Sequence, residues 1–171
     1  MIRFFLSVGF AFILFLATFF LLVTMVEYWL LENWFEVESL TGIRQKEWLN
    51  SFSNMALYTS LIALAVTVFW HTFGYYFYRI KTWQRAGSSR LAWIFIFVVM
   101  LIAILIFGWV WTDPTQDEGK LAAVGFYLLN AGFIYCFSSW ILSPATVKYA
   151  PVGSSVFASI GNMFMRLFYR S

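Results

Sequence analysis

Residues 91–111 read LAWIFIFVVMLIAILIFGWVW, without a single charged side chain. A helix that crosses roughly 30 Å of hydrocarbon needs about 20 consecutive apolar residues, and this stretch reaches that length. Three more stretches are free of charge and long enough: residues 4–26, about 54–78, and 121–143. The sequence therefore predicts an all-α integral membrane protein, built as a bundle of four transmembrane helices.

The composition of the 171 residues points to the same class. Hydrophobic residues make up 62% of the chain and charged residues 11%, whereas globular proteins are about half apolar and a quarter charged. The 21 Phe, 9 Trp and 9 Tyr carry more aromatic surface than the core of a soluble domain of this length could cover. No fixed-period repeat divides the chain, so we expect residues 1–171 to form a single membrane domain.

The first apolar stretch resembles a secretory signal peptide at its start, since it follows Met-Ile-Arg with its basic residue. Its apolar run is much longer than the roughly 7–15 residues of a cleavable signal, however, and no Ala-x-Ala pattern follows it. We therefore expect it to be retained as the first span.

The distribution of charge predicts the orientation, because basic residues near span ends stay on the cytoplasmic side. With four spans, one side receives these bases and no acid: Arg3, Arg79, Lys81, Arg85, Arg90, Lys148, Arg166 and Arg170. The other side receives all acids and three bases: Glu27, Glu32, Glu36, Glu38, Glu47, Asp113, Asp117, Glu118, Arg44, Lys46 and Lys120. Both termini are therefore expected in the cytoplasm, with the chain in an inner or plasma membrane.

The segments between the spans are short. We expect an outer loop at residues 31–53, with a turn at residues 39–42 and a short helix beginning near Ile43, and a basic inner loop at residues 79–90. In the tail, residues 144–171, apolar residues recur at helical spacing from Ser155 onward. This pattern predicts an interfacial amphipathic helix on the cytoplasmic side. A fifth span is the alternative, which the Gly, Ser, Asn and Pro residues of the tail disfavour.

Signatures of catalysis are missing from the sequence. No Asp, Glu, Lys or Arg lies in the central part of a span, and no nucleophile elbow, phosphate-binding glycine loop or His-Glu-x-x-His motif occurs. Cys136 is the only cysteine, which excludes an internal disulfide. We expect no enzymatic activity, no cofactor, no metal site within one chain, and no nucleic-acid binding, since the bases flank apolar runs.

A modest polar stripe marks the second stretch. Thr67, His71 and Tyr75 follow one another at intervals of four residues, so they share one helix face. One histidine cannot build a zinc or bis-imidazole haem site within a single chain, although an oligomer could supply a second ligand. The stripe is expected either to bond to a neighbouring helix or, together with Asn130, to line a pore.

Small residues gather on one face of the fourth stretch, including Gly125 and Gly132. Small side chains let helix backbones approach closely, and Asn130 and Ser138 are placed to bond across helices. The face is expected to pack within the bundle or against another subunit. By contrast, residues 91–110 contain little besides apolar and aromatic side chains, as expected for a lipid-facing helix.

Together these features favour a non-catalytic, self-associating membrane subunit that anchors or signals to a cytoplasmic partner in a larger machine of the secretion, conjugation or phage-defence type. Arg85 and Arg90 in the basic inner loop are expected to bind that partner. The alternative is a homo-oligomeric ion channel or pore-forming effector. A lipid- or quinone-interacting enzyme subunit is a third hypothesis.

Overall fold

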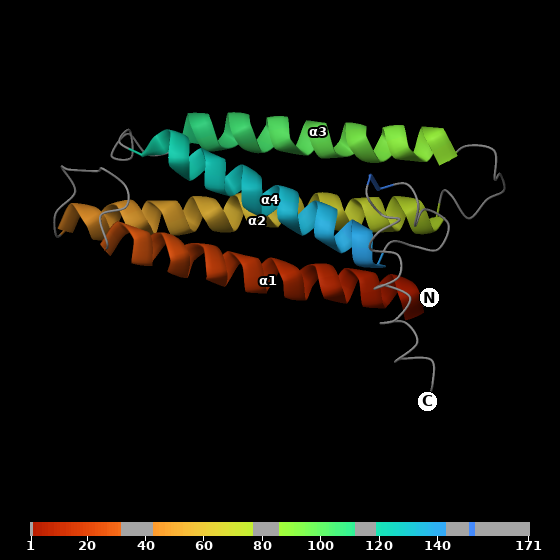
Figure 1. The fold of residues 1–171 in the computed structure, drawn as a ribbon, viewed down its shortest axis with the longest axis horizontal. Helices are drawn as coiled ribbons and strands as arrows, with labels where there is room; N and C mark the ends of the chain where they lie inside the picture. The colour runs from red at the N-terminus through yellow and green to blue at the C-terminus, as the bar shows by residue number, and fades with distance from the viewer. Residues whose placement is uncertain (1, 32–42, 77–85, 112–118, 143–150, 153–171) are drawn as a thin grey trace.

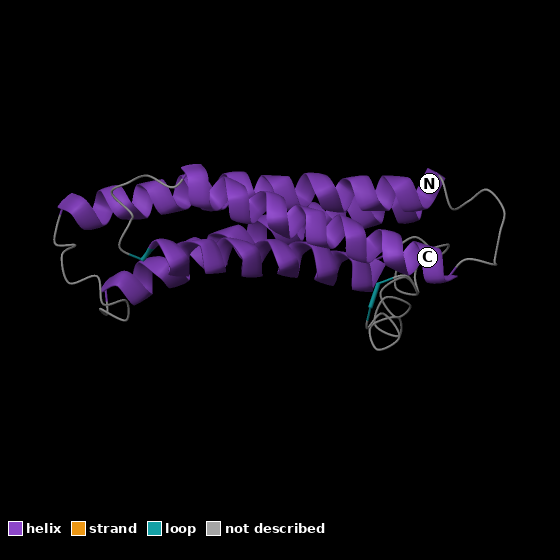
Figure 2. Ribbon diagram, turned by 90° about the horizontal axis from the view of Figure 1, so that it is seen from above, coloured by secondary structure: helices purple, strands orange, loops and turns teal. Residues whose placement is uncertain are grey.

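A computed structural model describes residues 2–31, 43–76, 86–111, 119–142 and 151–152. These residues form four helices and no strand: α1 (Ile2–Leu31), α2 (Ile43–Tyr76), α3 (Ala86–Trp111) and α4 (Lys120–Leu142). Each helix contains a segment long and apolar enough to cross a membrane. Consecutive helices run in opposite directions along the length of the molecule (Figures 1 and 2). We call the end that holds the start of α1 the N-terminal end of the bundle.

Two helix boundaries differ from the sequence prediction. α2 begins at Ile43 and continues without interruption to Tyr76, so the separate short helix expected near Ile43 is instead the first part of α2. Its Trp48 and Phe52 are buried and their rings stack at 5.4 Å, which gives this part of the helix a packed face. α3 begins at Ala86, so Arg90 lies in a helix and not in a loop. A charge ends an apolar run, but it does not end a helix.

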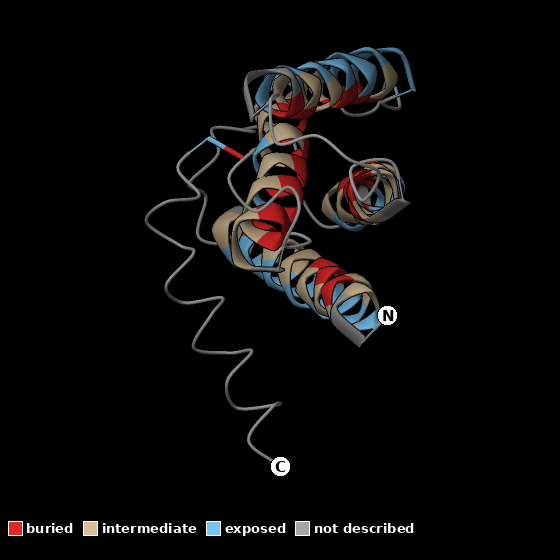
Figure 3. Ribbon diagram, turned by 90° about the vertical axis from the view of Figure 1, so that its right-hand side faces the viewer, coloured by how far each residue is buried: buried red, intermediate tan, exposed pale blue. Residues whose placement is uncertain are grey.

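α2 and α4 form the central pair of the bundle, flanked by α1 and α3 (Figure 3). α4 packs against the three other helices, as α2 does, whereas α1 and α3 make no comparable contact with each other. In the most apolar segments of α2 and α4, 39% and 44% of the residues are buried, against 17% and 22% in α1 and α3. The outward surfaces of α1 and α3 are consequently broad and apolar.

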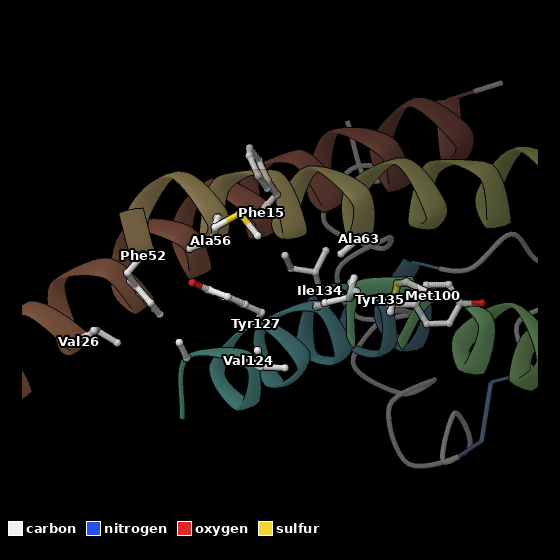
Figure 4. Packing of buried hydrophobic residues seen from close by; sticks show 14 of the residues in the cluster. Phe15, Val26, Phe52, Ala56, Ala63, Met100, Val124, Tyr127, Ile134 and Tyr135 are labelled. Carbon is white, nitrogen blue, oxygen red and sulfur yellow. The ribbon is translucent and has the colours of Figure 1, made fainter. Parts of the chain in front are cut away.

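The core consists of aromatic clusters joined by smaller side chains (Figure 4). Away from the N-terminal end, Phe52 of α2 stacks on Tyr127 of α4, with ring centroids 5.2 Å apart. Nearer the N-terminal end, Trp93 and Phe97 of α3 stack on Tyr135 of α4 at 5.4 and 5.6 Å. Each such pair contributes about 0.5–1.5 kcal/mol beyond the burial of its area. The aromatic pairs therefore hold both α2 and α3 to α4.

The ends of α4 are also fixed by local contacts. Gly119 adopts a positive φ of 79° just before the helix, a conformation that disfavours any residue with a side chain. Its carbonyl accepts the first helical hydrogen bond, from the Ala123 amide at 2.9 Å. At the other end, the Trp140 indole donates to the Val152 carbonyl at 2.6 Å, which ties the chain beyond α4 back to the helix.

Candidate functional site

The buried polar side chains are concentrated on the central pair, α2 and α4. None of them is an Asp, Glu, Lys or Arg, and seven of the nine in the described residues belong to these two helices; the full set is Ser7, Thr59, Ser60, Thr67, His71, Ser89, Asn130, Ser138 and Ser139. Burying a polar group is costly unless it is hydrogen-bonded. The partners of these groups therefore indicate what the polar residues do.

Two hydrogen bonds join α2 to α4. Asn130, which we expected to bond across helices, donates from Nδ2 to Ser60 Oγ at 2.7 Å. His71 Nε2 lies 3.1 Å from Ser138 Oγ, nearer the N-terminal end. Hydrogen bonds between helices in a membrane contribute about 0.6 kcal/mol on average and up to roughly 1.7 kcal/mol. The two bonds thus fix the register of the central pair at two separate levels.

The polar stripe of α2 faces the chain's own helices. Thr67 and His71 are fully buried, and the Thr67 hydroxyl donates to the Ala63 carbonyl one turn earlier, at 2.7 Å. Tyr75 is half-buried, with its ring 5.3 Å from that of Phe4 on α1. The stripe is therefore not on a surface that a second copy of the chain could reach without opening the bundle.

Some buried polar atoms have no hydrogen-bond partner among the described residues: Trp70 Nε1, His71 Nδ1 and Tyr127 Oη. A buried group left in this way costs about 1–3 kcal/mol. The two ring nitrogens belong to neighbouring residues of α2, while Tyr127 lies on α4 beside Phe52, so the three atoms do not form one cluster. α2 and α4 therefore contain buried hydrogen-bonding atoms that no described residue satisfies.

A third set of hydrogen bonds joins α3 to α4. Trp93 Nε1 donates to Ser139 Oγ at 3.0 Å, and the Tyr135 hydroxyl donates back to the Trp93 carbonyl at 3.2 Å. The Ser139 hydroxyl in turn donates to the Tyr135 carbonyl at 2.7 Å. The sequence prediction missed this connection, because it treated Trp93 as one more apolar residue of a lipid-facing helix. An indole N–H inside a span, which needs an acceptor, was the available signal.

The glycines have different surroundings from those the small-residue pattern suggests. A Cβ on Gly125 would meet nothing within 4 Å, and one on Gly132 would meet only the Phe97 ring, at 3.9 Å. A close approach occurs instead at Gly108 of α3, where a Cβ would lie 3.3 Å from Tyr127 Cδ2. Gly108 thus allows a close contact between α3 and α4, whereas Gly125 is open to the surroundings.

An apolar groove of about 440 Å³ lies between α3 and α4. Phe97 and Leu101 line it from α3, and the remaining lining residues come from α4: Leu128, Leu129, Gly132, Phe133, Cys136, Phe137 and Trp140. Gly132 therefore borders an open space instead of a neighbouring backbone. The hydrogen bond of Trp140 to Val152 lies at one end of the groove.

Of the two arginines expected to bind a partner, the structure describes only Arg90. Arg85 lies outside the described residues, whereas Arg90 is exposed in the first part of α3. At the opposite end of the bundle, Lys120 lies over the Trp109 ring, 5.2 Å from its centroid. The described part of the chain holds no group of three His, Cys, Asp or Glu side chains that could bind a metal ion.

The described helices thus have hydrogen bonds between them inside the bundle, and outside they have a largely apolar surface that includes the groove between α3 and α4. The buried polar side chains of the described residues include no Asp or Glu. Comparison with known proteins found no matching family model, no matching curated protein and no matching solved structure.

Proposed function

We propose that this chain is a non-catalytic, four-span membrane subunit that self-associates and anchors or signals to a cytoplasmic partner in a larger membrane machine. The observation that carries the proposal is how the buried polar groups are used. Ser60 with Asn130, and His71 with Ser138, join helices of the same chain. Such bonds suit a rigid scaffold better than a reaction centre.

The orientation with both ends in the cytoplasm is supported by the distribution of charge along the sequence, because one side of a four-span chain receives eight of the eleven bases and no acid. Of the charged residues in the described helices, Arg3 and Arg90 are near the N-terminal end of the bundle, and the others are at the opposite end: Glu27, Arg44, Lys46, Glu47 and Lys120. Basic residues favour the cytoplasmic side and acids contribute little to orientation. The proposed amphipathic tail helix lies outside the described residues, and it would rest on the same cytoplasmic face.

Self-association is supported by the open side of α4. Gly125 would accept a side chain without a clash, and its neighbours Leu121 and Leu129 are 77% and 72% exposed. A close approach at a small residue is a common way for membrane helices to associate. We therefore place the contact between copies at Gly125.

Light scattering on the purified protein, in several mild detergents and in nanodiscs, tests this contact. The wild-type chain is expected as an oligomer, and Gly125→Leu should lower its mass because the larger side chain separates the helices. Gly9→Leu on α1 is the matched control, since a Cβ on Gly9 also meets nothing within 4 Å. A monomeric wild type, or equal masses for all three proteins, would contradict the proposal.

Partner docking is proposed on the basic cytoplasmic face, with Arg85 and Arg90 as its contacts. An acidic partner would associate faster through these charges, and its binding would weaken with salt. Arg85→Gln should reduce co-purification of the partner, whereas Arg79→Gln removes the same charge next to a span end and serves as control. Co-purification at unchanged affinity across a wide range of salt would exclude this surface.

The channel alternative has less support from the structure. Thr67, His71 and Asn130 were the polar residues available to line a pore, and all three are buried between helices of one chain. A conductance measurement on the protein in liposomes distinguishes the two functions. Reproducible single-channel currents that change in Asn130→Leu would favour the channel.

A further inference from the structure

The groove between α3 and α4 has the dimensions of a hydrocarbon chain. From Leu128 to Trp140 it follows α4 for about 18 Å, at 1.5 Å per residue. Its volume of about 440 Å³ then corresponds to a mean cross-section of roughly 25 Å². A helix with its side chains is about 10–12 Å wide, so its cross-section is several times larger. A helix of a second copy would therefore insert only side chains into the groove, whereas an extended hydrocarbon chain fits within it.

The lining of the groove is chemically suited to a lipid tail. Its residues are apolar apart from the edges of Cys136 and Trp140, and four of them are aromatic: Phe97, Phe133, Phe137 and Trp140. Gly132 leaves the space open, because a side chain there would project past the Phe97 ring into the groove. The groove therefore offers an unbranched apolar chain continuous contact along its length.

A cation lies beyond one end of the groove, on the correct face of α3. Residues separated by 7 or 11 positions on a helix point within about 20° of one another, and Arg90 has these separations from Phe97 and Leu101. The hydrogen bond between Trp93 and Ser139 places position 93 level with the Trp140 end of the groove. The exposed Arg90 is therefore about one helical turn farther toward the N-terminal end.

We infer that this groove binds one acyl chain of an anionic phospholipid, with the lipid phosphate at Arg90. The lipid belongs to the leaflet at the N-terminal end of the bundle, which is the cytoplasmic leaflet in the orientation proposed above. Trp140 lies at the boundary between chain and headgroup, where interfacial aromatics are enriched. The lipid covers Gly132, and the contact between copies lies at Gly125, on the same face of α4 and almost two turns farther from the N-terminal end.

Native mass spectrometry on the full chain tests the site. The protein is reconstituted with phosphatidylglycerol or with phosphatidylcholine of the same acyl chains and then transferred to detergent. We expect about one phosphatidylglycerol per chain to be retained under washing that removes phosphatidylcholine. A basic residue near the membrane surface contributes about 1 kcal/mol toward an anionic lipid, so Arg90→Gln should lower the retention of phosphatidylglycerol about fivefold.

Further variants distinguish the contribution of the groove to lipid binding from that of Arg90. Gly132→Leu should abolish retention of phosphatidylglycerol, because it fills the groove, whereas Gly125→Leu and Arg79→Gln should leave retention unchanged. Arg90→Gln replaces an exposed residue, so it remains informative even if Gly132→Leu does not fold. Wild-type retention of phosphatidylglycerol in Arg90→Gln would overturn the phosphate site. Loss of the oligomer without loss of lipid in Gly132→Leu would assign the groove to a second copy. Lipid retention does not require a cytoplasmic partner, so failure of partner docking leaves this inference standing.

Discussion

The hydrogen bond between Ser60 and Asn130 provides the sharpest test of the packing of α2 against α4. Asn130 Nδ2 donates to Ser60 Oγ at 2.7 Å, and the Ser60 hydroxyl itself donates to the Ala56 carbonyl. Asn130→Leu removes the interhelical bond and leaves Ser60 still hydrogen-bonded within α2. Ser60→Ala instead leaves the Asn130 amide buried without this acceptor, and a buried polar group that loses its partner is destabilising. We therefore expect Ser60→Ala to be the more damaging of the two substitutions.

The interaction itself is measured by the double-mutant cycle of these two substitutions. Its coupling energy should be about 0.6 kcal/mol and not above roughly 1.7 kcal/mol, the range of hydrogen bonds between membrane helices. The free energies of unfolding of the four proteins can be measured in bicelles by steric trapping or in a titration with denaturing detergent. Combining Ser60→Ala with Ser139→Ala is the control, since Ser139 bonds to α3 and within α4.

The control pair should be additive, to within about 0.3–0.5 kcal/mol. Coupling between Ser60 and Asn130 no larger than in the control would refute the reasoning. The two side chains would then not bond, and the register of α2 on α4 would differ from the one described.

Two other predictions concern the glycines and the topology. Gly108→Leu should lower the free energy of unfolding by about 1–3 kcal/mol, the usual cost of overpacking, because a Cβ at this position already lies 3.3 Å from the Tyr127 ring. The control Gly9→Leu should change the free energy of unfolding little, since a Cβ there meets nothing within 4 Å. Equal effects of the two substitutions would show that Gly108 is not tightly packed. For the topology, Ser39→Cys in a Cys136→Ser background should react in intact cells with an impermeant thiol reagent, whereas Ser88→Cys should not. Labelling at position 88 would contradict the proposed orientation.

Helix formation and helix number could be predicted from the sequence because both depend on local properties. A membrane-spanning segment satisfies its backbone within itself, so a charge-free run of sufficient length is enough to identify it. All four predicted stretches lie largely within helices of the structure. The span starts expected at about residue 54 and at residue 91 lie inside α2 and α3, since charged residues such as Lys46, Glu47 and Arg90 interrupt the apolar run but continue the helix.

The sequence also determined which two of the four apolar stretches carry polar residues. In the structure these stretches belong to α2 and α4, the central helices of the bundle. Which residues meet was decided by tertiary structure alone. The sequence has glycines at 108, 125 and 132, and only Gly108 lies tightly against another helix. The pairing of Trp93 with Ser139, and of Ser60 with Asn130, joins residues 46 and 70 positions apart. Such contacts depend on the rotation of each helix about its axis and on which helices are neighbours. Those properties are set by packing and hydrogen bonds across the whole bundle, because lipid provides no hydrophobic force that would turn one apolar face inward over another.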